Sequence, residues 1–294
     1  MNNFGEVITA MVTPFDENYN IDWNSLDKLI EYLIENGSDS LLFAGTTGES
    51  PTLTDDEKIS LFEFAKKKLN NTKIKIMAGT GSNDTKHTIE LSKKAQDVGV
   101  DSLLIVTPYY NKPTQSGLLK HFDTICKSIN TPIVVYNVPS RTCCNISSKT
   151  CKELSQMQNI VGIKEASGDL KQIAEILRDC DSSFKVYSGN DGDTFAIVSL
   201  GGEGVISVAS HIIGKEIKEM ISLIKKGKIF EAAKLHKEFL DIFYGIFITT
   251  SPIPIKTALN LKGIKVGPLR PPLYEMDDSD FEIFKKLLLK HNLI

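Results

Sequence analysis

The chain has 294 residues, of which 41% are hydrophobic and 24% charged, and its formal net charge is −3. This length suits one large domain or two ordinary ones, and the slightly acidic balance argues against a nucleic-acid partner. No apolar run approaches the roughly 20 residues that cross a membrane, and the N-terminus lacks a signal-peptide pattern. The five cysteines show no CxxC spacing, which favours reduced thiols in the cytoplasm.

Short runs rich in Val, Ile, Leu and Phe recur along the chain. They are apolar on both faces rather than alternating, which is typical of strands in a parallel sheet that is covered on each side. The eight runs are Val7–Val12, Ser40–Ala44, Ile74–Ala78, Ser102–Val106, Ile133–Tyr136, Ile160–Ile163, Lys185–Tyr187 and Gly204–Val208.

Longer amphipathic segments separate these runs. Residues 24–37 carry apolar side chains at helical spacing and end in Gly37, and a second segment starts with Thr54 as N-cap and Glu57 three positions later. Eight strands that alternate with helices predict an α/β fold, the (β/α)₈ TIM barrel of about 250 residues. The rival, a doubly wound open sheet, needs a glycine-rich phosphate turn after its first strand, and "TPFDENYN" has none.

The residues that follow Ser210 are mostly helical in pattern. The first of these segments, "GKEIKEMISLIKKG", would complete the barrel, and the others are surplus to it. We therefore predict a catalytic barrel over residues 1–224 and a C-terminal helical region over residues 225–294.

In a barrel of this type, chemistry is located at the C-terminal ends of the strands. The second run is followed by "GTTG", whose hydroxyls and exposed backbone N–H groups can bind a carboxylate. Tyr136 is a phenol that could shuttle a proton if its surroundings lowered its pKa, and Arg141 offers a planar cation suited to a second carboxylate.

Lys164 directly follows the apolar run Ile160–Ile163. Near a dry barrel interior its ammonium form is disfavoured, so its pKa should fall and a free amine should be present. A free amine beside a carbonyl substrate forms an imine, which is covalent catalysis through a Schiff base. The strand ends together predict a Schiff-base enzyme for an anionic carbonyl substrate.

Each feature also has an ordinary structural interpretation. A lysine at a strand end can form a surface ion pair, "GTTG" is a common tight turn, and Tyr109 and Tyr110 could be packing or interface residues. Arg141 could pair with a loop carboxylate. A barrel that binds a ligand without turnover is a further alternative, and "GTGSND" leaves a phosphosugar enzyme open. The five histidines have no metal-binding spacing, and GxGxxG and P-loop motifs are absent from the sequence.

The motifs "GTTGESPTL", "AGTGSNDT", "TPYYNKPTQ", "YNVPSRT", "GIKEASGD" and "GVISV" occur in this order between residue 3 and about residue 294. In them the chain resembles the class I, Schiff-base-forming pyruvate aldolases of the N-acetylneuraminate lyase superfamily. The arginine of "YNVPSRT" points to the dihydrodipicolinate synthase branch rather than to lyases that act on sugar acids.

The resemblance implies a lyase that condenses pyruvate with L-aspartate 4-semialdehyde, the first committed step of the diaminopimelate route to L-lysine, without a metal or organic cofactor. It also implies a homotetramer built as a dimer of tight dimers. The chemical roles that it implies are an imine at Lys164, proton transfer by Tyr136, and a proton relay from Tyr136 through Thr46 to Tyr110 of the neighbouring subunit. For the substrates, it implies that Thr47 binds the pyruvate carboxylate and that Arg141 binds the semialdehyde carboxylate. It also implies that the backbone of Gly189 and Ile206 lines the pocket.

Some relatives are inhibited by L-lysine at a site between subunits, which corresponds here to Pro51, Asp55, Lys58, Asn83, His87 and Tyr109. Asn83 and Tyr109 match the sensitive pattern. Lys58 stands where sensitive enzymes have histidine, and His87 where they have glutamate, so a ligand ammonium group would lose a partner and meet a cation. We therefore predict weak or absent inhibition, and a half effect at sub-millimolar L-lysine in an inhibition curve would contradict this.

Overall fold

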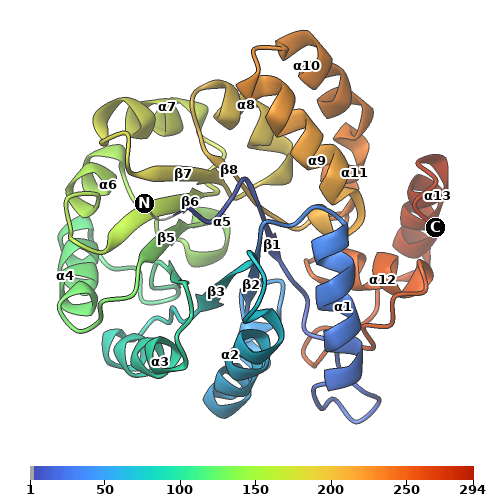
Figure 1. Ribbon diagram of the computed structural model, residues 1–294, viewed down its shortest axis with the longest axis horizontal. Coiled ribbons are helices and arrows are strands. Elements are labelled where there is room, and N and C mark those ends of the chain that lie inside the picture. The colour runs from blue at the N-terminus through green and yellow to red at the C-terminus, as the bar shows by residue number, and fades with distance from the viewer. Residues whose placement is uncertain (1–2) are drawn as a thin grey trace.

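The computed structural model describes residues 3–294 and contains a closed barrel of eight parallel strands in chain order (Figure 1). Its strands are β1 (Val7–Ala10), β2 (Ser40–Phe43), β3 (Lys75–Gly79), β4 (Ser102–Val106), β5 (Ile133–Asn137), β6 (Ile160–Glu165), β7 (Lys185–Ser188) and β8 (Gly204–Ser207). The predicted TIM barrel is therefore confirmed, and the open-sheet alternative is wrong, because β1 pairs with β8.

Helices surround the strands in Figure 1. They are α1 (Trp23–Glu35), α2 (Asp55–Leu69), α3 (Thr85–Val98), α4 (Gln115–Cys126), α5 (Pro139–Thr142), α6 (Ser148–Leu154), α7 (Leu170–Asp179), α8 (Thr194–Ser199), α9 (Ser210–Lys225), α10 (Ile229–Glu238), α11 (Leu240–Gly245), α12 (Ile253–Leu261) and α13 (Asp278–Lys290), with short 3₁₀ turns η1 (Ser50–Thr52) and η2 (Asp191–Asp193). In residues 3–294, no helix combines the length and apolar character needed to cross a bilayer.

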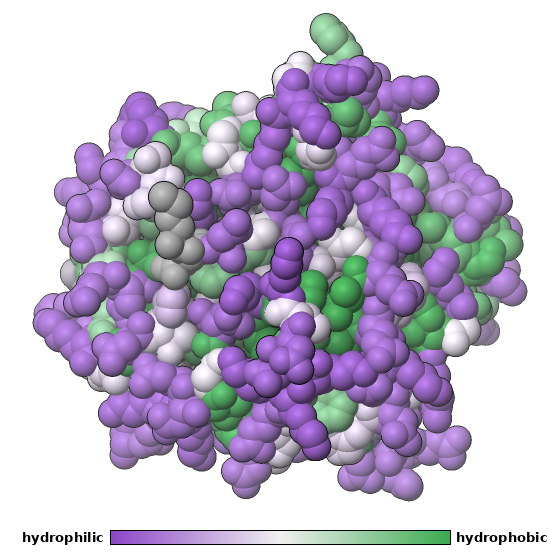
Figure 2. All heavy atoms as spheres, in the orientation of Figure 1, coloured by the Kyte–Doolittle hydropathy of each residue, from purple (hydrophilic) through white to green (hydrophobic). Residues whose placement is uncertain are grey.

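Apolar side chains fill both faces of the strands. One set, which includes Ile8, Leu42, Leu104 and Ile206, packs inside the barrel, and a larger set packs between the strands and the helices. This two-sided burial explains why the strand segments are continuously apolar in sequence. Around this core, the face shown in Figure 2 is covered mostly by hydrophilic residues.

The strand boundaries differ from the expected runs mainly at their C-terminal ends. β1 ends at Ala10 rather than Val12, and β6 continues through Lys164 to Glu165. Lys164 is thus the penultimate residue of a strand, and it is paired in register with Tyr136 on β5. Because side chains alternate along a strand, this register places the lysine and the phenol on the same side of the sheet.

The C-terminal helices pack against the barrel. Helix α9 contacts α10 and α12, and α11 contacts η2 at the end of β7. Helix α12 carries Lys256, which forms a buried ion pair with Glu49 in the turn that follows β2. The division at residue 224 falls within the last turn of α9 and stays a prediction.

Candidate active site

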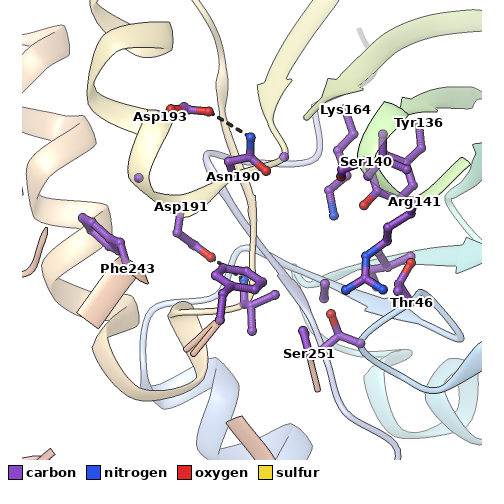
Figure 3. A pocket seen from close by; sticks show the side chains of 18 of the residues that line it. Thr46, Tyr136, Ser140, Arg141, Lys164, Asn190, Asp191, Asp193, Phe243 and Ser251 are labelled. Atoms are coloured by element: carbon purple, nitrogen blue, oxygen red, sulfur yellow. Dashed lines mark hydrogen bonds between the residues drawn. The ribbon is translucent and has the colours of Figure 1, made fainter. Parts of the chain in front are cut away.

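A cavity of about 330 Å³ lies where the strands of the barrel end. Figure 3 shows Lys164, Tyr136, Arg141 and Thr46 on one side of this cavity and Asp191 on the other. Thr47 and Gly189 also line it. The structure therefore brings six of the sequence-predicted residues together, although they come from β5, β6 and the loops after β2, β5 and β7.

Lys164 is 5% exposed, and its Nζ lies 4.5 Å from the centroid of the Tyr136 ring. The pKa of Lys164 is lowered to about 8, mainly by burial, because an ammonium group loses solvation in the barrel. The nearby carboxylate of Asp191 opposes this fall, and the cation of Arg141 contributes to it. The predicted fall in the pKa of this lysine is confirmed, and an appreciable fraction is free amine near neutral pH.

This lowered pKa predicts how imine formation depends on pH. The neutral amine is the nucleophile, so the rate of trappable imine formation with pyruvate should rise with pH and reach half its plateau near pH 8. An unperturbed lysine would place that midpoint near the ordinary pKa of about 10.4. Rapid-quench trapping at fixed pyruvate between pH 6 and about 10 measures the midpoint. A rate that still climbs tenfold per pH unit above pH 9 would contradict the prediction.

The Tyr136 phenol is buried at the wall of the cavity that Thr46 also lines. Burial raises the pKa of Tyr136, although the Arg141 cation and the polar Thr46 side chain act in the opposite direction. The condition set from the sequence, that the surroundings lower this pKa, is therefore not met. A protonated phenol beside Lys164 can instead donate a proton to an oxygen or nitrogen that becomes basic during a reaction.

The turn after β2 is compact and closes on itself. Gly48 N–H donates to the carbonyl of Gly45, and the Thr13 hydroxyl donates to the carbonyl of Gly48 at 2.7 Å. A Cβ at position 48 would lie 3.1 Å from the Met11 carbonyl oxygen, so a larger residue would be crowded there and glycine suits this close approach. Within residues 3–294, the backbone N–H groups of Thr46 and Thr47 have no backbone acceptor. Such donors suit a ligand carboxylate.

Arg141 lies in α5, and its side chain lines the cavity from the side opposite η2 (Figure 3). Among residues 3–294 no carboxylate forms an ion pair with Arg141, so the structural ion-pair alternative for this residue is wrong. A planar cation at a cavity wall with no protein counter-ion is suited to an anionic ligand.

A second cavity, of about 550 Å³, adjoins the first and shares Thr46, Tyr136 and Arg141 with it. Its lining includes all six residues that correspond to the L-lysine site of sensitive relatives, namely Pro51, Asp55, Lys58, Asn83, His87 and Tyr109. The His87 Nε2 atom lies 2.8 Å from Asp55 Oδ2, and Lys58 Nζ lies 3.9 Å from Asp55 Oδ1. Asp55, one of two aspartates that line this cavity, is thus already partnered by basic side chains.

Two predicted residues lie outside the first cavity's lining. Tyr110 is 89% exposed and has a positive φ of 72°, in the loop after β4. Ile206 is buried among the apolar side chains inside the barrel. Their assigned roles, in a neighbouring subunit's site and as pocket-lining backbone, stay predictions.

Other lining residues were not identified from the sequence. Asp191 is buried and accepts hydrogen bonds from the Ser207 hydroxyl and from the N–H groups of Val208 and Ala209. The sequence feature that could have identified Asp191 as a site residue is its position in "SGND", directly after a strand. The C-terminal region supplies Phe243, Tyr244, Phe247 and Ser251, which no local motif marks as site residues.

Comparison with known proteins agrees with this geometry. Residues 3–291 match the model of the dihydrodipicolinate synthetase family. A 4-hydroxy-tetrahydrodipicolinate synthase from Oceanobacillus iheyensis is 48% identical over 286 residues, which is 97% of each chain.

Solved structures are similar over nearly the whole length. A dihydrodipicolinate synthase from Bacillus anthracis has a TM-score of 0.96 and 43% identity, over 98% of this chain and 99% of that one. The enzyme from Cyanidioschyzon merolae, solved with lysine bound, has a TM-score of 0.97 and 43% identity, over 99% of each chain. The chain therefore belongs to the dihydrodipicolinate synthetase family.

Proposed function

We infer that the chain is a lyase that condenses pyruvate with L-aspartate 4-semialdehyde to 4-hydroxy-tetrahydrodipicolinate, through a Schiff base at Lys164. The condensation is the activity for which its curated relatives are named, in the diaminopimelate route to L-lysine. The observation that supports the role of Lys164 is its burial beside Tyr136, with a pKa lowered to about 8.

The first half of the proposed reaction takes place at pyruvate. Thr47 and the N–H groups of the turn after β2 bind the carboxylate, while the Lys164 amine attacks the keto carbon. Tyr136 donates a proton to the carbonyl oxygen, which leaves as water when the imine forms. The protonated imine then withdraws electrons from the methyl group. A methyl proton passes to the Tyr136 phenolate, which restores the phenol and leaves an enamine nucleophile.

The second half joins the two substrates. The enamine carbon attacks the aldehyde carbon of the semialdehyde, whose carboxylate is bound by Arg141 at the cavity wall. The aldehyde oxygen takes a proton from the substrate ammonium group and becomes the 4-hydroxyl group. The amine so formed then displaces Lys164 from the imine carbon, which closes the ring and regenerates the enzyme. Two anionic substrates account for two separate carboxylate-binding elements, and no step in this scheme requires a metal or an organic cofactor.

Reductive trapping tests the role of Lys164. The protein is incubated with pyruvate and borohydride, digested, and mapped by mass spectrometry. We expect one adduct, on Lys164, and none in the Lys164→Arg variant. Lys58→Arg, at a second buried lysine with a burial-lowered pKa, is the matched control and should retain the adduct. An adduct on another lysine of the wild-type chain would refute the mechanism.

We also propose that the chain works as a cytoplasmic homotetramer in which Tyr110 completes the neighbouring subunit's relay. The exposure of Tyr109 and Tyr110 in one loop, with backbone held at positive φ at Tyr110 and Lys112, supports a contact made by another subunit. Loss of activity in Tyr110→Phe, with the pyruvate adduct still formed, is the expected result.

A further inference from the structure

A buried polar cluster lies directly behind the catalytic strands. Asn137 and Glu165 are the residues that follow Tyr136 and Lys164, and they are paired in register between β5 and β6. Side chains alternate along a strand, so Tyr136 and Lys164 face the cavity while Asn137 and Glu165 face the surrounding helices. Both outward-facing side chains are almost completely buried.

The Glu165 carboxylate receives hydrogen bonds from donors on three segments. The Asn137 amide lies 3.0 Å from Oε2, the backbone N–H of Ser167 lies 2.7 Å from Oε1, and the Gln172 amide lies 3.4 Å from Oε2. These segments are β5, the loop after β6, and helix α7. Burial raises the pKa of Glu165, and the hydrogen bonds from Ser167, Asn137 and Gln172 oppose that rise because they stabilise the ionised carboxylate, which can accept from all of them at once.

Asn137 extends the cluster to residues 139–146, the segment after β5 that contains α5 with Arg141 and is called the Arg141 loop below. Its Oδ1 accepts from the backbone N–H of Ile146 at 3.0 Å, and its amide donates to Asn145 Oδ1 at 2.8 Å. Asn145 in turn donates to Gln172 at 2.8 Å, which closes the cluster. The end of the Arg141 loop is therefore attached directly to Asn137, which follows Tyr136, and through Gln172 to Glu165, which follows Lys164.

We propose that Glu165 and Asn137 are positioning residues, which hold the imine lysine, the Tyr136 phenol and the Arg141 loop in one fixed arrangement. A buried carboxylate is costly to desolvate, and apolar residues of similar volume would pack such a position at least as stably. A positioning role for the cluster, which joins β5, β6 and the Arg141 loop, would explain why a carboxylate occupies this buried position. The proposal rests on the role inferred above for Lys164.

The test compares catalysis per active site rather than per protein. Glu165→Gln is nearly isosteric, but it replaces one acceptor oxygen with a donor that faces other donors. Active sites are counted by borohydride trapping with pyruvate, and kcat is expressed per trapped site. Because a displacement on the order of 1 Å can cost up to about 100-fold in rate, we expect kcat per trapped site to fall about tenfold.

The matched control is Glu175→Gln on the same helix as Gln172. Glu175 accepts from the Ser148 hydroxyl at 2.7 Å, between α6 and α7 and away from the catalytic strands. The Glu175→Gln variant should keep kcat per trapped site within about twofold of the wild type, since a glutamine oxygen can still accept from the Ser148 hydroxyl and this contact does not join the catalytic strands.

Rescue by an exchanged pair separates positioning from general packing. In Asn137→Asp with Glu165→Gln, the new glutamine amide can donate to the new aspartate, so the contact between the strands is restored with its polarity reversed. We expect kcat per trapped site to recover at least half of its loss on a logarithmic scale. If Glu165→Gln fails to fold, the exchanged pair is compared directly with Asn137→Asp alone.

Two results would overturn the proposal. One is a Glu165→Gln enzyme with fewer folded molecules but a wild-type kcat per trapped site, which a purely structural role predicts. The other is an exchanged pair no better than its single variants. A wild-type adduct that maps elsewhere than Lys164 would instead refute the proposed function.

Discussion

Replacing Arg141 with alanine is expected to lower kcat/KM for L-aspartate 4-semialdehyde by about 100-fold, while pyruvate imine formation changes by less than about threefold. A hydrogen-bonded contact to a charged group contributes about 1.5–3 kcal/mol, and 2.7 kcal/mol corresponds to about 100-fold. Arg141 forms no ion pair with a carboxylate of residues 3–294, which leaves its guanidinium available for the substrate carboxylate that we propose it binds. Its removal also slightly favours the ammonium form at Lys164 by lifting one of the effects that lower that pKa.

Steady-state kinetics in each substrate and rapid-quench trapping of the imine measure the two effects separately. Arg178→Ala is the control, because within residues 3–294 this exposed arginine pairs only with the adjacent Asp179 and does not line the cavity. Equal losses in semialdehyde use and in imine formation would count against carboxylate binding by Arg141. They would indicate instead that the substitution disturbs the whole cavity.

Replacing Lys256 with methionine is expected to lower the free energy of unfolding by about 3–5 kcal/mol. Lys256 and Glu49 have side chains that are each 1% exposed, with Nζ and Oε1 2.8 Å apart. Lys256 also donates to the carbonyl of Pro268 and lies 4.4 Å from the Phe15 ring centroid. The methionine leaves the Glu49 carboxylate buried without its cation, although the N–H of Arg270 still donates to it at 2.8 Å.

Chemical denaturation at fixed protein concentration measures this loss. Lys290→Met is the matched control, since Lys290 pairs with Asp241 at an exposed position and should change stability by less than about 1 kcal/mol. Adding Glu49→Gln to Lys256→Met should recover part of the loss by removing the unpaired charge. If the two lysine substitutions had the same effect, the buried pair would not anchor the turn after β2 as we infer.

The barrel could be predicted from the sequence because each strand is buried on both faces and each helix on one. That environment gives continuous apolar runs such as Ile133–Tyr136 and helical spacing between them, which are local signals. The ends of strands were harder to locate, since Lys164 and Glu165 are polar and still belong to β6. Lys164 belongs to the candidate active site and Glu165 to the buried polar cluster with Asn137. These polar side chains end the apolar pattern from which a strand is predicted, although the strand continues through them.

Candidate residues next to strand ends could also be identified from the sequence, because chemistry in this fold lies at one rim. Lys164, Tyr136 and Arg141 were found in this way. Residues supplied by the C-terminal region were not, since Phe243 and Ser251 reach the cavity only after the chain has passed once around the barrel. Glu49 was likewise unassigned, because its partner Lys256 is distant in sequence.

The sequence by itself determined which groups are available: an amine, a phenol, an arginine and a hydroxyl-bearing turn at the ends of apolar runs. Only the tertiary structure decided their protonation and spacing. Burial in the closed barrel lowers the pKa of Lys164 and raises that of Tyr136, opposite changes for a cationic acid and a neutral one. Those directions follow from desolvation, which depends on the atoms that surround each group and not on its neighbours along the chain.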